Sequence, residues 1–336
     1  MTDIVVVDHS FVETSHRKRW RFLAERHDVD VTLLVPKVWY SDWLREEIEY
    51  RPDHIKENNY EVRPLRTTSK HDWMKYLFIS HDTEFRSIDP DLVHVQYAPM
   101  ALIHHQMLLY KRLWGADTKY TFFTMNALGV PRERLDQRLR WRHLKRGADA
   151  ALGHYPGCRD SLQEAGFEKP IYLQTSYGVN EDLFAPDEEA RAETRAELGF
   201  EDTLVIGFVG RLDTDKGLDD LLEAVPLEGV DWSLLLVGDG DMREETERVI
   251  QQNGWEDRVG MTGYVPHEEV PRYMRAMDCY VLGSKTRDYW IDTFPRTIVQ
   301  AMACEVPVIG SDSGAIPFQV RDAGLIYPEG DVAELR

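Results

Sequence analysis

The chain has 336 residues, of which 43% are apolar and 29% charged, and this composition excludes a disordered or fibrous protein and suits two domains of ordinary size. Its 59 acidic and 40 basic side chains give a net charge of −19, which argues against a nucleic-acid partner because phosphate contacts need clustered Lys and Arg. The basic residues are 11 Lys and 29 Arg. An excess of acid with few lysines is typical of a halophile protein, because a very salty cytoplasm screens the self-repulsion; an ordinary acidic protein is the alternative.

Cysteines and apolar runs indicate the compartment. Cys158, Cys279 and Cys304 form no CxxC pair, so the sequence predicts neither a disulfide framework nor a zinc site and fits a reducing environment. No apolar run approaches the ~20 residues that span a bilayer. The chain enters the strand-like run Ile4–Val7 without a signal peptide before it. We therefore expect a cytoplasmic protein, either free or peripheral on the inner membrane face.

Short apolar runs bounded by turn residues recur along the chain, with helical stretches between them. Six lie in the first half: Ile4–Val7, Val31–Val35, Leu92–Val95, Tyr120–Phe123, Ala150–Leu152 and Ile171–Leu173. Six more follow residue 200: Leu204–Val209, Ser233–Val237, Gly260–Thr262, Cys279–Leu282, Pro307–Ile309 and Leu325–Tyr327. Strands that alternate with helices predict parallel sheets covered on both faces. The sequence thus predicts two α/β domains.

The boundary between the two series is visible at Phe184–Asp187, which leads into a charged helical stretch over Glu188–Leu198. We therefore place the first domain at residues 1–185 and the second at residues 186–336. The first domain has a net charge of −1 and the second of −18. The acidity is thus almost wholly a property of the second domain.

Two basic stretches with aromatic residues among them lie in the near-neutral first domain, Arg17–Phe22 and Arg132–Arg146. The aromatic residues are Trp20, Phe22 and Trp141. These stretches are either solvated helix faces or a surface that meets an anionic acceptor or an anionic membrane. The second interpretation predicts peripheral membrane contact through the first domain.

A candidate phosphate site opens the second domain. The strand Leu204–Val209 ends at Gly210, and the loop that follows holds Arg211 and Lys216. Ligands bind at the carboxyl ends of parallel strands, beside helix N-termini, where a guanidinium and an ammonium predict a diphosphate site. Asp213 and Asp215 form a DxD in the same loop, but a lone DxD among 59 acidic residues arises easily by chance, so we predict no metal site.

Four motifs lie between residues 204 and 330. They are GRLDTDKG at residues 210–217, DTFPRTIVQ at residues 292–300, AMACEVPVI at residues 301–309 and SDSGAIPF at residues 311–318. These motifs resemble the GRL-loop-KG, EGFGxxxxE, AMACGxPVI and SDxGGxPE motifs of the retaining glycosyltransferases of family four. Weaker likeness appears earlier, where residues 177–186 resemble GVDxxxFxP.

The resemblance implies the GT-B fold, an α/β architecture of two Rossmann-like domains that face each other across a cleft. The first domain would receive the acceptor and the second would hold a nucleotide-diphospho-sugar donor. Members of the family usually continue beyond the point at which this chain stops, so the second domain is expected to be truncated at its end.

The resemblance also implies which residues hold the donor phosphates. Arg211 and Lys216 would bind the diphosphate. The turn that begins the following helix would add backbone amides, from Phe294, Arg296 and Thr297.

Other matched positions imply contacts to the sugar and the nucleoside. Asp292 stands where the family's first glutamate lies near the donor sugar, so it is the candidate catalytic residue. Gln300 stands where the second glutamate holds the ribose hydroxyls. Tyr264 and Val265 stand where the base meets the backbone.

Three departures from the family motifs bear on catalysis. Asp292 is one methylene shorter than glutamate, and Gln300 accepts a hydrogen bond without carrying a charge. Pro295 replaces a glycine and has no N–H to offer a ligand.

The motifs favour a metal-independent and cofactor-free glycosyltransferase that moves a sugar, with retention, to a glycan or lipid-linked acceptor. The alternative is a catalytically impaired nucleotide-sugar or glycan-binding protein. A nicotinamide enzyme is disfavoured because no GxGxxG follows the first strand.

Overall fold

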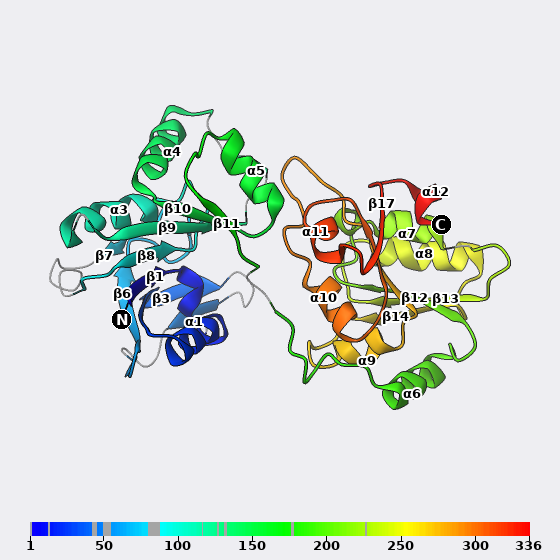
Figure 1. Cartoon of the computed structure of the whole chain (residues 1–336). Helices are drawn as coiled ribbons and strands as arrows, with labels where there is room; N and C mark the ends of the chain where they lie inside the picture. Colours follow the sequence, from blue (N-terminus) through cyan, green and yellow to red (C-terminus); the bar gives the residue numbers. More distant parts are fainter. Residues whose placement is uncertain are drawn as a thin grey trace. The chain divides into compact units, whose positions relative to one another are not determined.

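The structure is a computed structural model, which describes residues 2–12, 14–41, 46–49, 55–79, 88–115, 117–125, 128–130, 133–175, 178–225 and 227–336 (Figure 1). The chain divides into two compact units, Met1–His154 with Cys158–Gln174 and Tyr155–Gly157 with Thr175–Arg336. The expected boundary after residue 185 lies later than this division. The reason is that Phe184 is buried in the core of the second unit, with Leu183 packed against that core.

The first unit is built on a mainly parallel sheet with the strand order β11-β10-β9-β8-β1-β2-β6-β5. Its strands are β1 (Thr2–Val7), β2 (Val29–Pro36), β5 (Ile55–Glu57), β6 (Tyr60–Thr67), β8 (Leu92–Val95), β9 (Lys119–Thr124), β10 (Ala150–Gly153) and β11 (Ile171–Leu173). Only β5 and the short β7 (Phe78–Ile79) pair antiparallel to β6 in this sheet, within the described residues. A separate antiparallel pair is formed by β3 (Val38–Ser41) and β4 (Glu46–Glu49).

Helices connect these strands, and the apolar runs of the sequence form the core. The helical segments are η1 (His9–Val12), α1 (Thr14–Arg26), α3 (Ile103–Trp114), α4 (Leu135–Gly147) and α5 (Pro156–Glu164). Val6, Val93 and Phe122 are fully buried on neighbouring strands. A continuous apolar run such as Ile4–Val7 is what a strand covered on both faces requires. Each of the first six predicted strands is therefore present.

The second unit holds an all-parallel sheet with the order β14-β13-β12-β15-β16-β17. Its strands are β12 (Leu204–Val209), β13 (Trp232–Val237), β14 (Val259–Gly263), β15 (Cys279–Leu282), β16 (Val308–Ser311) and β17 (Gly324–Tyr327). Its helices are α6 (Glu188–Leu198), η2 (Thr214–Lys216), α7 (Leu218–Ala224), α8 (Arg243–Asn253), α9 (Val270–Arg275), α10 (Arg296–Ala303), α11 (Ile316–Val320) and α12 (Val332–Leu335). The second six predicted strands are also present, with the fifth shifted by a residue or two.

Helix α6 illustrates how sequence signals and tertiary contacts combine. Asp187 caps its N-terminus by accepting a hydrogen bond from the Ala190 N–H at 3.0 Å. Arg191 and Arg195 on the same helix both pair with Asp278, which precedes β15. Burial alone would raise the pKa of Asp278, but the Val205 N–H and the two guanidinium groups outweigh burial and lower it. This charged cluster anchors the start of the second unit to its sheet.

Each sheet reverses its direction of winding once, and the reversal fixes where ligands have room to bind. In the second unit the chain runs from β12 outward to β13 and β14, and then returns to β15 on the other side of β12. In the first unit it runs from β1 to β2 and β6, and then returns to β8 on the other side of β1. The loops that leave the carboxyl ends of such neighbouring strands diverge and flank a crevice. No helix of the described residues is long and apolar enough to cross a membrane.

Candidate functional site

Glycines bring the loops after β12, β13 and β15 into direct backbone contact. A Cβ on Gly238 would lie 1.9 Å from the carbonyl oxygen of Gly210, where β12 ends. A Cβ on Gly217 would lie 2.0 Å from the carbonyl oxygen of Gly283, and Gly217 also has a φ of +71°. Only glycine allows both the close approach and the left-handed conformation at that position. The sequence thus builds a tight set of loops at the reversal point of the second sheet.

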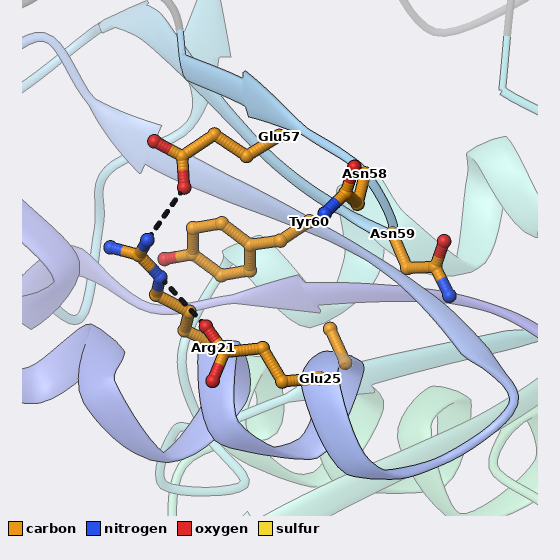
Figure 2. Close-up of a pocket in the computed structure, with 7 residues that line it drawn as sticks. Arg21, Glu25, Glu57, Asn58, Asn59 and Tyr60 are labelled. Atoms are coloured by element: carbon orange, nitrogen blue, oxygen red, sulfur yellow. Dashed lines mark hydrogen bonds and ion pairs between the residues drawn. The ribbon is translucent and has the colours of Figure 1, made fainter.

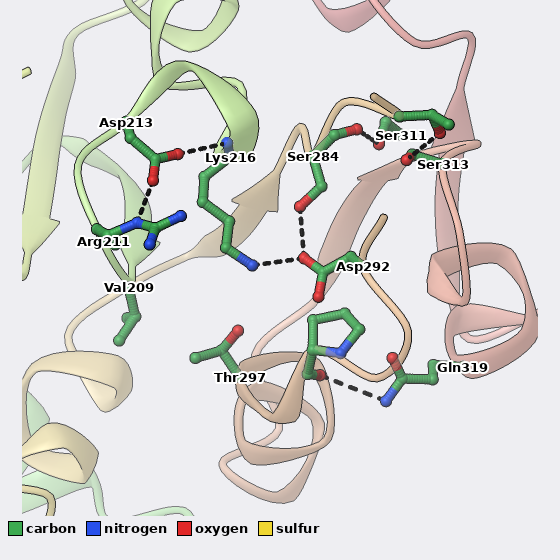
Figure 3. A network of polar contacts seen from close by, with 12 residues as sticks. Val209, Arg211, Asp213, Lys216, Ser284, Asp292, Thr297, Ser311, Ser313 and Gln319 are labelled. Carbon is green, nitrogen blue, oxygen red and sulfur yellow. Dashed lines mark hydrogen bonds and ion pairs between the residues drawn. The ribbon is translucent and has the colours of Figure 1, made fainter. Parts of the chain in front are cut away.

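Asp213 organises the loop that holds the two basic residues. Its carboxylate accepts a hydrogen bond from the Lys216 N–H at 3.0 Å and so caps η2. The same carboxylate pairs with Arg211 Nε, and the two terminal nitrogens of that guanidinium point away from the carboxylate (Figure 3). The Arg211 side chain is 60% exposed. A flexible, solvated guanidinium with two terminal donors can reach a ligand above the loop.

Lys216 and Asp292 form the centre of the site (Figure 3). The Lys216 ammonium lies 2.6 Å from Asp292 Oδ2, and Ser284 Oγ donates to the same oxygen at 2.7 Å. Asp292 is only 7% exposed. The ammonium also lies 4.7 Å from the centre of the Trp290 ring, a distance at which the ring face stabilises a cation. The pair is therefore held rigidly, although 76 residues separate its members.

The start of α10 lies beside this pair. Tyr280 on β15 donates its hydroxyl to Thr297 Oγ1 at 2.6 Å and lies 3.4 Å from the Val209 carbonyl oxygen. Burial raises the pKa of Tyr280, so the phenol stays a donor. Thr297 is thereby tied to the end of β12. The first backbone N–H groups of a helix have no acceptor within the helix and carry partial positive charge, which suits an anion.

The other predicted residues at this turn lie at its outer side. Phe294 is half-buried, Arg296 is exposed, and Pro295 occupies the N-cap of α10 with a φ of −65°. The Pro295 carbonyl oxygen accepts from Gln319 Nε2 at 3.3 Å. Pro295 therefore presents a fixed turn without an N–H of its own, between Phe294 and Arg296.

Two of the three residues predicted to contact the nucleoside lie further out on the same sheet. Tyr264 and Val265 follow β14, the edge strand, two strands away from β12. Tyr264 is 73% exposed, and Val265 packs partly against the core of the second unit. Gln300 is buried on α10. The structure brings Lys216 and Asp292 into direct contact and bonds Thr297 to Tyr280, whereas Tyr264 follows the edge strand.

The two aspartates of the DxD already interact with cationic side chains. Asp213 pairs with Arg211, and Asp215 accepts from Arg287 Nε at 3.0 Å. In the part of the chain that the structure describes, no group of three or more His, Cys, Asp or Glu side chains is arranged to hold a metal ion. Because both carboxylates are paired with arginines, this DxD can order its loop without a metal ion.

The second unit contains one other lysine, Lys285, and its surroundings differ from those of Lys216. Its ammonium lies 2.8 Å from Asp219 Oδ2 and 2.7 Å from Asp220 Oδ1. Burial alone would lower the pKa of Lys285, but its hydrogen bonds to Asp219 and Asp220 outweigh burial and raise it. Lys285 thus neutralises the acidic first turn of α7, which leaves Lys216 as the lysine that faces the site.

Sequence reasoning missed three residues of this cluster, Ser284, Trp290 and Tyr280. Ser284 follows the end of β15, so the rule about carboxyl ends of strands could have identified it. Tyr280 and Trp290 carry no such signal, because the first lies inside an apolar strand and the second inside a loop.

The basic stretch on α1 is paired within the first unit. Arg21 lies between Glu25 and Glu57, at 3.1 Å and 2.8 Å (Figure 2). Arg17 is buried, and Arg19 donates to the Gln96 side chain at 2.6 Å. Of these three arginines, Arg21 is thus neutralised by two carboxylates, and Arg17 is withdrawn from the surface.

The stretch on α4 differs from the expectation in its aromatic residue. Trp141 is only 4% exposed and donates its indole N–H to the Ala165 carbonyl oxygen at 2.8 Å, so it belongs to the core. The exposed apolar residues are instead Leu135 and Leu139, at 73% and 57%. Arg132, where the stretch begins, lies outside the described residues.

Residues 190–336 match the model of the family described as Glycosyl transferases group 1. A GDP-mannose-dependent alpha-(1-6)-phosphatidylinositol monomannoside mannosyltransferase of Mycolicibacterium smegmatis is 35% identical over 162 residues, which are 46% of this chain and 42% of the relative. An alpha-D-kanosaminyltransferase of Streptomyces kanamyceticus is 28% identical over 242 residues, which are 64% of this chain and 61% of the relative. The chain thus spans about half the length of the curated relatives that it matches.

A solved structure shares the fold over the whole chain. An Anabaena protein in complex with UDP aligns with a TM-score of 0.68 and 17% identity, and the alignment covers 100% of this chain and 88% of that one. At this level of identity the likeness establishes the fold, which is the two-domain Rossmann-like architecture expected from the motifs.

Proposed function

We propose that the chain transfers a sugar from a nucleotide-diphospho-sugar to an acceptor hydroxyl with retention of configuration, since its residues 190–336 match the model of the family described as Glycosyl transferases group 1. The observation that carries this proposal is the cluster of Arg211, Lys216 and the α10 N-terminus at the reversal point of the second sheet. Cations and helix N–H groups at such a point suit a diphosphate.

The proposed reaction breaks the bond between the sugar's anomeric carbon and a diphosphate oxygen. The acceptor oxygen forms the new bond on the same face, and the acceptor proton passes to the departing diphosphate. Lys216 and Arg211 would stabilise the negative charge that develops on that leaving group. Asp292 Oδ2 is engaged by Lys216 and Ser284, which supports a role in orienting the lysine and the donor sugar rather than in attack on the sugar.

A panel of nucleotide sugars would test this proposal. Incubation of the protein with UDP- and GDP-linked hexoses should give slow release of the nucleoside diphosphate from one of them, with water as the acceptor. Release that depends on Lys216 would support transfer chemistry. Tight binding of a nucleotide sugar without any release would favour the second candidate, an impaired binding protein, for which Pro295 at the N-cap of α10 is the specific reason.

We predict that the activity requires no divalent metal. Asp213 and Asp215 are engaged by Arg211 and Arg287, so the leaving group would be stabilised by protein cations alone. Activity measured with EDTA should equal activity without it, and Asp215→Asn should retain most of it. Strict dependence on manganese or magnesium would contradict this prediction.

We further propose that the acceptor is anionic or lipid-linked and that the first unit meets the membrane through α4. Leu135, Arg138, Leu139, Arg142 and Arg146 recur with a spacing of three or four residues, so they share one helix face, and all five are exposed. We call this set the α4 face. Leucines can enter the interface while arginines meet anionic headgroups, each worth roughly 1 kcal/mol. A relative named for phosphatidylinositol monomannoside is compatible with such an acceptor.

Vesicle co-sedimentation would test the α4 face. The protein should bind vesicles with phosphatidylglycerol more than vesicles of phosphatidylcholine alone, and Arg138→Gln with Arg142→Gln should reduce that binding at low salt. At 1 M salt, where the Debye length is ~3 Å, Leu135→Ser with Leu139→Ser should have the larger effect. Arg248→Gln and Leu325→Ser, exposed positions of the second unit, should change nothing. Equal, negligible sedimentation with both lipids would favour a soluble acceptor.

A further inference from the structure

The side chains gathered at the reversal point of the first sheet are aromatic rings, whereas those at the reversal point of the second sheet are charged. His9 and Tyr97 are the second residues after the carboxyl ends of β1 and β8, the two strands at the reversal. Trp39 lies on β3, directly after β2, and Trp73 lies between β6 and β7. Four adjacent strands, β8, β1, β2 and β6, therefore contribute a ring side chain beyond the same edge of the sheet.

These rings contact one another. The His9 ring centre lies 4.8 Å from that of Trp39 and 5.2 Å from that of Tyr97. Trp73 stacks on Tyr97 at 6.4 Å with an angle of 20° between the rings. Tyr97 thus links His9 to Trp73, and its hydroxyl accepts a hydrogen bond from the His9 N–H at 2.6 Å.

Two of these rings are buried and two are partly exposed to solvent. Trp39 and Tyr97 are buried, at 5% and 4% exposure. Trp73 is 42% exposed, and the His9 side chain is 29% exposed. The exposed Trp73 ring packs on the buried Tyr97 ring, so its orientation is fixed before any ligand binds.

We propose that Trp73 and His9 form a platform on which a sugar ring of the acceptor stacks. One face of a pyranose carries C–H groups, and it loses water favourably against an indole ring, while the hydroxyls at the ring edge remain free for hydrogen bonds. This inference rests on the proposed function, because it assigns the acceptor to the unit that does not carry the phosphate cluster. It makes Trp73 a specificity-determining residue for acceptors that present a glycosyl ring.

Ligand-observed saturation-transfer NMR on the full chain would test the platform. The probes are methyl α-D-mannopyranoside and methyl α-D-glucopyranoside, and at least one should bind. Trp73→Ala should weaken that binding about five- to tenfold, whereas Trp73→Phe, which keeps a ring, should stay within about twofold of the wild type. Phe22→Ala is the matched control, because Phe22 is a similarly exposed aromatic residue of the same unit, on α1.

Calorimetry with UDP and GDP separates failure of the platform from failure of the proposed function. Nucleoside diphosphate affinity should be the same in Trp73→Ala and in the wild type. Equal sugar binding by Trp73→Ala and wild type, or no sugar binding by a protein that does bind a nucleoside diphosphate, would overturn the platform. Weaker diphosphate binding by Trp73→Ala would reassign these rings to the nucleobase. Absence of diphosphate binding by the wild type would contradict the proposed function instead.

Discussion

Replacing Arg211 or Lys216 by alanine is expected to weaken nucleoside diphosphate binding by about 1.5–3 kcal/mol, the range for hydrogen bonds to charged groups, or roughly 10- to 150-fold in affinity. Both side chains belong to the loop after β12, and the second is held at 2.6 Å from Asp292. Calorimetric titration would measure the change. The nucleoside without phosphates should bind mutant and wild type equally, because neither cation would contact it.

Two further variants make this prediction specific. Arg248 resembles Arg211 in exposure and in having one acidic partner close in sequence, so Arg248→Ala should leave diphosphate affinity unchanged. Asp292→Asn removes the counter-charge of Lys216 while keeping an acceptor for Ser284 Oγ. We expect this variant to bind the diphosphate at least as tightly as the wild type and to lose transfer activity. Unchanged diphosphate affinity in both alanine variants would move the phosphate site elsewhere.

Gly217→Ala should destabilise the second unit far more than an alanine at another left-handed glycine. Gly199 has a φ of +74°, and a Cβ there would meet no atom within 4 Å, whereas at Gly217, with a φ of +71°, the Cβ would lie 2.0 Å from the Gly283 carbonyl oxygen. Gly199→Ala should cost about 1–2 kcal/mol of unfolding free energy for its backbone conformation. Gly217→Ala should cost the same amount plus about 1–3 kcal/mol for overpacking.

Hydrogen exchange of peptides from β12 and β13 in rising urea would measure both variants within the second unit. Gly217→Ala should also lose diphosphate affinity, since the loop that holds Lys216 must move away from the loop that holds Ser284. Gly199→Ala should retain that affinity, because α6 ends away from these loops. Equal destabilisation by the two substitutions would show that the contact between Gly217 and Gly283 contributes little.

The sequence predicted six strands of the first sheet and all six of the second, because parallel strands buried on both faces require continuous apolar runs, and such runs are local. Strand β13, Trp232–Val237, is buried at every residue, and its apolar run alone predicts a strand. The loop with Arg211 and Lys216 was found by the same local rule, since it follows such a strand. Strands β3 to β7 were missed, because they are short, interrupted by charged residues or, like β3, part of a small antiparallel pair.

Only the tertiary structure decided which side chains meet. Lys216 faces Asp292 because β15 returns beside β12, and no local pattern encodes that return. Trp141 joined the core while Leu135 and Leu139 of the same helix remained exposed, because the neighbouring elements determine which helix face is covered. His9, Trp39 and Trp73 gathered at one edge for the same reason. Sequence by itself determines local burial through apolar periodicity, whereas the pairing of residues far apart depends on strand order, which is set by how the whole chain packs.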